Sequence, residues 1–157
     1  MGRRAISYHL PAYRAKSTEG TTCIDGKLLA ACIGRACKSL GGDVAFVGST
    51  DLTHYGPGYG FTPSGMGLKG LVWAKDVNDR RMIKLILAMQ DDKIVEEAEA
   101  NQNACGAGAI AAAIAASKAY GATRATLLEH TTSFEVLREL YEEPMRDAVG
   151  YAAVAFD

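Results

Sequence analysis

The sequence predicts an α/β protein in which helices flank a largely parallel sheet. A short apolar run at residues 43–47 has the β-branched and aromatic content of a buried strand, and further strands are predicted at 124–130 and 148–156. Between these runs, apolar residues recur at the three- and four-residue spacing of amphipathic helices. Strands separated by helices are typical of layered α/β sheets.

Size and composition predict a single globular domain over residues 1–157, of which 1–24 are the least well defined. The chain has 157 residues, 48% of them hydrophobic and 22% charged, which is ordinary for a soluble protein. The net charge of -1 gives no reason to expect nucleic acid or an anionic membrane as a partner. Because no secretory signal or membrane-spanning apolar run is found, we expect a cytoplasmic protein with reduced thiols.

The first helix is predicted over residues 25–40 and is expected to end at Gly41-Gly42. Its apolar positions are Leu28, Leu29, Cys32, Ile33, Ala36, Cys37 and Leu40. Cys32 and Cys37 are therefore expected to be small core residues rather than metal ligands.

The remaining elements follow from periodicity and end signals: helices at about 76–89, 92–100 and 107–119, and a polar connection at 134–147. Asp91 or Asp92 is expected to cap the second of these helices, and Gly121 to end the third.

The strand predicted at 43–47 is expected to deliver Asp51 and His54 to its carboxyl end, just before a glycine-rich loop. In open α/β sheets, ligands bind in the crevice beyond the strand ends. A carboxylate three residues from a histidine orients the imidazole and raises its basicity, whether the histidine acts as a base or as a metal ligand. The alternative is structural: Asp51 caps a turn and His54 packs under the loop.

Cys105 is the second candidate, because it lies at the predicted start of a helix. Free backbone N–H groups and the helix dipole stabilise a thiolate there. Cys105 is thus a candidate nucleophile or soft metal ligand, with a small buried side chain as the alternative. His130 is a third candidate, because it ends a predicted strand beside Thr131, Thr132 and Ser133; the alternative is a structural histidine that bonds to their hydroxyls.

Taken in order, these motifs resemble those of the Memo-like family, also called AmmeMemoRadiSam system protein B. Val47–Gly56 resembles its "SSD-(hydrophobic)-x-H-(W/Y)-G" signature, and Asn103–Gly106 its "ICG" segment. His130–Ser133 and Val149–Ala153 resemble its "YATS…VGYAA" ending. Arg4–Pro11 is a looser match to "H-S-x-E-x-x-LP", with Arg4 and Ser7 in place of the histidine and glutamate.

The resemblance implies a fold related to the class III extradiol dioxygenases, with a pocket that holds iron or copper through two histidines and the cysteine. By this match Cys105 takes the cysteine position, and Asp51 and His54 take pocket positions. Cys105 and His54 are then the metal-ligand candidates. The resemblance also implies substrate-binding positions at Ser49, His130, Thr132, Ser133 and Tyr151.

The family's "HAGY" and "PSHH" motifs, which lie in its N-terminal half, have no counterpart in this chain. The implied metal set is therefore incomplete, and the resemblance leaves open whether the chain holds a metal. A sheet without its first strands has an exposed edge, which proteins normally pair or cover. We therefore expect a homo-oligomer, or a complex with a subunit that supplies the N-terminal half.

Three functions remain open at this point. The first is a non-haem metal-dependent oxidoreductase, in which Asp51 orients His54 and Cys105 is the thiolate ligand. The second is a non-catalytic module that binds a protein or peptide. The third is a metal-free hydrolase or transferase, with Cys105 as the nucleophile and His54 as its base.

Overall fold

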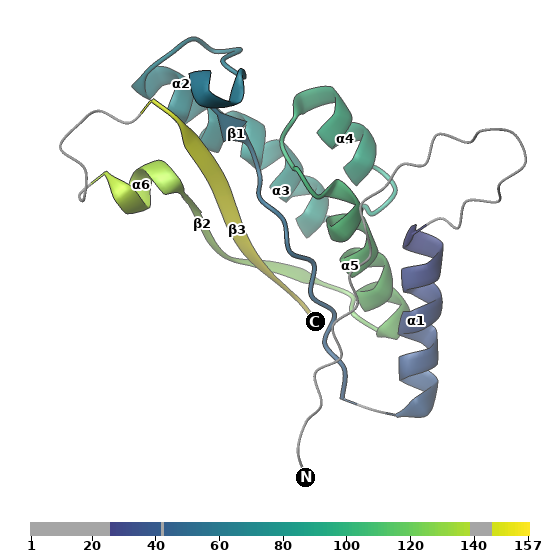
Figure 1. The fold of residues 1–157 in the computed structure, drawn as a ribbon. Coiled ribbons are helices and arrows are strands. Elements are labelled where there is room, and N and C mark those ends of the chain that lie inside the picture. The colour runs from purple at the N-terminus through teal and green to yellow at the C-terminus, as the bar shows by residue number, and fades with distance from the viewer. Residues whose placement is uncertain (1–25, 42, 139–145) are drawn as a thin grey trace, which may run out of the picture.

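The computed structural model describes residues 26–41, 43–138 and 146–157, so the segment 1–24 lies outside it (Figure 1). Its sheet has the strand order β1 (His54–Tyr55), β3 (Ala148–Phe156), β2 (Ala125–Thr132). The α/β class is confirmed. The parallel arrangement is not confirmed, because both strand pairings in the described residues are antiparallel. No predicted crossover helix separates β2 from β3, and two strands joined in that way run antiparallel.

The strand predicted at 43–47 is wrong as a sheet element. Residues 43–53 run alongside the helices as an extended segment that belongs to no strand, and Val44 and Val47 are 38% and 87% exposed. The segment reaches the sheet only at Leu52, whose N–H donates to the carbonyl of Gly150 over 2.9 Å. His54 therefore begins a short strand instead of following a long one.

The core lies between the sheet and a layer of three helices, α3 (Arg80–Leu87), α4 (Ile94–Asn101) and α5 (Ala107–Tyr120). Side chains at alternate positions of β3 pack against this layer, as expected for a strand with one covered face. The main core cluster contains Leu52, Met82, Ile83, Ile86, Met89, Ile94, Ala98, Ile110, Ala111 and Ile114. In the described part of the chain, no helix is both long and apolar enough to cross a membrane.

Helix α1 (Gly26–Leu40) has the predicted bounds, but it packs on α5 through a different face. Ala30 and Gly34 are its buried residues, and a Cβ at Gly34 would overlap the carbonyl oxygen of Ala116. The predicted apolar face is largely exposed, and the expectation that Cys32 is a core residue is wrong. Small side chains decide this contact because they allow the two helix backbones to approach closely.

The helix predicted at 76–89 is the last part of a longer one. It begins with α2 (Leu68–Trp73) and passes through a π-helical segment, η2 (Ala74–Asp79), into α3. A π-turn widens the helix by one residue, and such turns are frequent at functional sites. Two consecutive polar residues of this segment, Asn78 and Asp79, are both buried.

The other predicted elements are confirmed except at two ends. Helix α4 starts after Lys93 without a side-chain cap, and Asp91 instead accepts a hydrogen bond from Lys118 Nζ over 2.6 Å. Helix α5 ends at Gly121 as predicted. The connection predicted at 134–147 contains the short helix α6 (Ser133–Leu137), while residues 139–145 lie outside the described residues.

Candidate functional site

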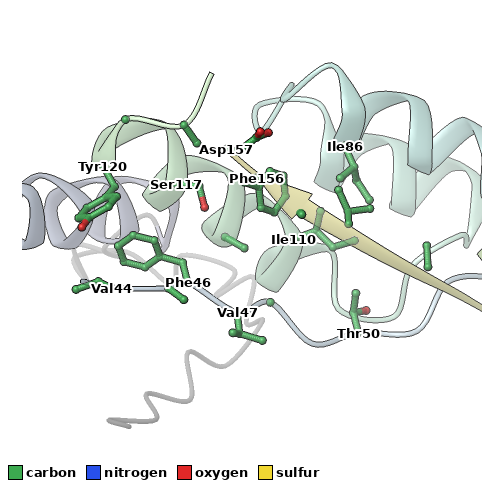
Figure 2. A pocket seen from close by; sticks show the side chains of 18 of the residues that line it. Val44, Phe46, Val47, Thr50, Ile86, Ile110, Ser117, Tyr120, Phe156 and Asp157 are labelled. Atoms are coloured by element: carbon green, nitrogen blue, oxygen red, sulfur yellow. The ribbon is translucent and has the colours of Figure 1, made fainter. Parts of the chain in front are cut away.

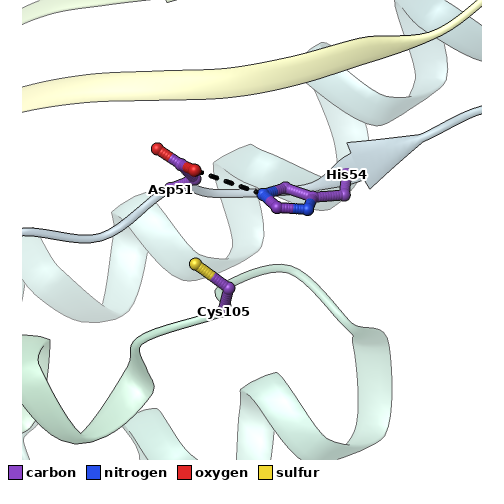
Figure 3. Close-up of side chains that lie close together, drawn as sticks. All are labelled: Asp51, His54 and Cys105. Atoms are coloured by element: carbon purple, nitrogen blue, oxygen red, sulfur yellow. Dashed lines mark hydrogen bonds and ion pairs between the residues drawn. The ribbon is translucent and has the colours of Figure 1, made fainter. Parts of the chain in front are cut away.

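Asp51, His54 and Cys105 come together at one end of β1 (Figure 3). One ligand atom from each, a carboxylate oxygen, an imidazole nitrogen and Sγ, lie within 4.8 Å of one another. His54 Nε2 and Asp51 Oδ2 are 3.3 Å apart. Cys105 is exposed, and the Asp51 and His54 side chains are 46% and 35% exposed, so the group is open to solvent. Asp51 and His54 are thus paired with each other, and His54 also packs against Tyr59 of the glycine-rich loop.

Thr50 joins, through hydrogen bonds, the segment that carries Asp51 and His54 to the segment that carries Cys105. Its Oγ1 accepts the N–H of Gly106 over 2.7 Å and donates to the carbonyl of Asp51 over 3.0 Å. The N–H of Cys105 donates to the same Asp51 carbonyl over 3.2 Å. A Cβ at Gly106 would lie 2.7 Å from Thr50 Oγ1, so a glycine is needed for this approach. These contacts bring Cys105 next to Asp51.

We expect Thr50→Val to loosen this attachment while preserving side-chain shape. The Gly106 N–H loses its acceptor, at a cost of about 1–3 kcal/mol in the free energy of unfolding. Urea unfolding measures that cost, and the alkylation rate of Cys105 should rise as its loop is released. Thr126→Val, at an exposed position of β2, is the control. Equal stability and equal alkylation in the two variants would contradict this role of Thr50.

The π-helical segment holds the chain between Asp51 and His54. The N–H of Thr53 donates to Asp79 Oδ1 over 2.9 Å, and Asn78 Nδ2 donates to Thr53 Oγ1 over 3.1 Å. Thr53, Asn78 and Asp79 are each at most 1% exposed. Because Thr53 is held through both its backbone and its side chain, these hydrogen bonds fix the path of the chain that carries Asp51 and His54.

His130 does not join the cluster. Its Nε2 lies 3.2 Å from Asp79 Oδ2, and the His130 side chain is only 8% exposed. Burial raises the pKa of the Asp79 carboxyl, while hydrogen bonds from Thr53 and His130 act in the opposite direction. The partner predicted for His130 was a hydroxyl, which is wrong. The partner is instead the buried carboxylate of Asp79, which the π-helical segment η2 places beside β2.

Two of the other substrate-binding candidates have structural partners. Thr132 caps α6 in a reciprocal capping box with Glu135, and Ser133 Oγ accepts the N–H of Val149 over 2.9 Å. Ser49 is exposed just before Thr50. The substrate-binding roles of these residues remain predictions.

Two tyrosines lie close to the cluster. The Tyr59 ring is tilted against His54, with the ring centroids 4.9 Å apart. Tyr151 is 39% exposed, and partial burial, followed by the neighbouring Asp51 carboxylate, raises the pKa of its phenol. The substrate-binding role that the resemblance implies for Tyr151 remains a prediction.

Sequence reasoning missed the residues that support the site, namely Thr50, Thr53, Asn78 and Asp79. One signal was present in the sequence. Asn78-Asp79 is a pair of adjacent polar residues beside the apolar positions of a predicted helix. Adjacent residues of an α-helix point about 100° apart, so burying both requires contacts on two sides of the helix.

Comparison with known proteins gives a consistent family. The family model described as Memo-like protein matches residues 21–155. A MEMO1 family protein of Thermococcus kodakarensis is 38% identical over 122 residues, which are 77% of this chain and 40% of that protein. One of Pyrococcus furiosus is 39% identical over 121 residues, covering 76% of this chain and 39% of its own length. One of Methanosarcina barkeri is 34% identical over 146 residues, covering 92% and 46%.

The matched region is thus less than half the length of each of these relatives, although it covers most of this chain. The family-model match, residues 21–155, contains all three residues of the cluster and the segments that hold them in place. On these grounds, the chain belongs to the Memo-like protein family.

Proposed function

We propose that Asp51, His54 and Cys105 form a metal-binding site that supports redox chemistry on a small molecule. The observation that carries this proposal is the convergence of three different donor atoms within 4.8 Å. They come from two segments far apart in sequence that direct hydrogen bonds join.

The donor set fits iron or copper. Thiolate and imidazole suit Cu(I), and imidazole with carboxylate suits Fe(II). Ligand atoms at about 2.0–2.3 Å from one ion lie roughly 3–4 Å from each other, which accommodates the 3.3 Å between Asp51 Oδ2 and His54 Nε2. Three protein ligands leave at least one coordination position for a substrate.

A bound iron or copper ion would supply the electron transfer and polarise a ligated substrate atom. The protein residues have separate tasks. Asp51 either ligates or orients the His54 imidazole, and Cys105 supplies a soft ligand. The Tyr59 ring restricts rotation of His54. The Tyr151 phenol keeps its proton, because burial and the charge of Asp51 raise its pKa, and it is available to donate a hydrogen bond to a substrate.

The test is an anaerobic titration of the purified chain with Fe(II) and with Cu(I), followed by calorimetry and absorbance. We expect one equivalent to bind, with affinity falling by at least about 100-fold in Cys105→Ser and in His54→Ala. Cys32→Ser is the matched control, since Cys32 is also exposed but lies on α1. Redox substrates would be screened only after this result.

Equal binding by Cys105→Ser and wild type would contradict the proposed ligand set. Fast alkylation of Cys105 that needs His54 but no metal would favour the metal-free nucleophile instead. The short distance between these two side chains permits both, so the titration and the alkylation should be run on the same preparations.

A further inference from the structure

An apolar groove of about 670 Å³ lies beside the sheet and extends as far as Thr50 and Leu52, the neighbours of Asp51 (Figure 2). Its floor is formed by α5 and by Ile86 of α3. One wall is the extended segment 44–52, and the other is the end of β3, residues 152–157. Side chains such as Phe46, Ile110 and Phe156 make the groove mostly apolar.

The two walls are extended backbones that meet at one end of the groove. Leu52 N–H donates to the Gly150 carbonyl, and Gly150 N–H donates to the carbonyl of Thr53 over 3.0 Å. Beyond this point, among the described residues, no backbone hydrogen bond joins segment 43–51 to β3. The groove therefore lies in line with the β1–β3 pairing, where the backbone of segment 43–51 separates from that of β3.

Each wall offers backbone groups to the groove. One edge of β3 is taken by β2 along its length, whereas the other pairs with β1 only at Ala148 and Val149. Segment 43–51 sits close on α5, since a Cβ at Gly48 would lie 2.8 Å from the Ala109 carbonyl oxygen. Among the described residues, β3 has an open edge that faces the extended segment 43–51 over an apolar floor. This arrangement suits an added strand, which takes backbone hydrogen bonds and buries alternate side chains.

We propose that this groove receives a β-strand from the part of a Memo-like protein that this chain does not match. Two observations select that occupant. The groove continues an existing strand pairing, so its geometry suits a backbone. About 60% of the length of the Thermococcus kodakarensis relative lies outside the match, since the match covers 40% of it. The added strand has apolar residues at alternate positions, and these contact Ile110 and Ala113 on the floor of the groove.

The test is hydrogen exchange of the full chain, alone and co-expressed with the unmatched part of the Thermococcus kodakarensis relative. Alone, the amides of residues 43–50 and 151–156 that face the groove are expected to exchange fast. In the complex their exchange should slow by at least tenfold, while the amides that join β2 to β3 stay unchanged. No complex, or a complex without this protection, overturns the proposal.

Protection of the same amides in the chain alone also overturns it, because the chain itself or a second copy would then fill the groove. Size-exclusion chromatography with light scattering on the same sample distinguishes these two cases. This result does not depend on metal, so its failure is separate from failure of the proposed metal site.

Two proline variants test whether the wall pairs through its backbone. In an extended chain, residues of the same parity direct their N–H groups to the same side, so Val44 shares the direction of Leu52 and Val47 does not. Val44→Pro is expected to weaken the complex at least tenfold, and Val47→Pro to leave it within twofold. Both residues are exposed, so folding should be unaffected. Equal effects of the two variants overturn pairing at this edge.

Discussion

Gly56→Ala is expected to destabilise the protein by at least about 3 kcal/mol. Gly56 has φ 125° and ψ 172°, a conformation that is essentially restricted to glycine. A Cβ there would lie 2.6 Å from the Arg146 carbonyl oxygen and 2.8 Å from the Asp147 Cα. Because these are backbone atoms, a side-chain rotation cannot relieve the overlap. Gly56 directly follows β1, so the substitution should also disturb the position of His54.

Gly60→Ala is the matched control for this experiment. Gly60 also has a positive φ, of 65°, but no atom lies within 4 Å of a Cβ built on it. Its cost is therefore the left-handed conformation alone, about 1–2 kcal/mol. Urea unfolding of the two variants measures the difference. Equal losses would show that the contact with residues 146–147 is not what requires glycine at position 56.

Asp79→Ala is expected to cost about 2–6 kcal/mol, because two groups lose a hydrogen-bond partner at about 1–3 kcal/mol each. The substitution removes the acceptor for the Thr53 N–H and the partner of His130, and both groups lie in a largely buried region, with Thr53 1% and the His130 side chain 8% exposed. Asp79→Asn keeps an oxygen as acceptor for the Thr53 N–H and keeps a polar amide group beside His130 Nε2. We therefore expect the asparagine variant to lose less than half as much stability.

The same carboxyl gives a pH dependence of defined sign. Burial raises the pKa of Asp79 above 3.8, so the folded protein binds this proton more tightly than the unfolded chain does. Its contribution to stability is complete in acid and is lost as the pH rises from 3.8 through the higher value of the folded state. The stability of wild type minus that of Asp79→Asn should thus fall with rising pH. Chemical unfolding of both proteins at a series of pH values measures it, and a rise would contradict the assignment.

Local sequence patterns were sufficient for most helices and for two strands. Periodicity located α1, α5, β2 and β3 with nearly correct ends, since glycine and polar residues mark where such elements stop. The chemistry of the candidate site was also visible locally. Asp51 and His54 are three residues apart before a glycine-rich loop, and Cys105 stands just before a helix.

The convergence of these three side chains was not visible in the sequence. Asp51 and Cys105 are 54 positions apart, and their contact depends on the hydroxyl of Thr50 and on the absence of a side chain at Gly106. The sequence pattern around Asp51 carries no information about Cys105, and the pattern around Cys105 carries none about Asp51. The resemblance to the family indicated the shared site, and the backbone hydrogen bonds explain how it is assembled.

The sequence by itself determined the family, the order of elements and the residue types available for chemistry, because these depend on local spacing and composition. The tertiary structure decided the direction of the strands, the face that α1 turns to α5 and the partner of His130. It also decided that residues 43–51 stand away from β3. Each of these outcomes depends on contacts with residues that are distant in the sequence, and a local pattern carries no information about such contacts.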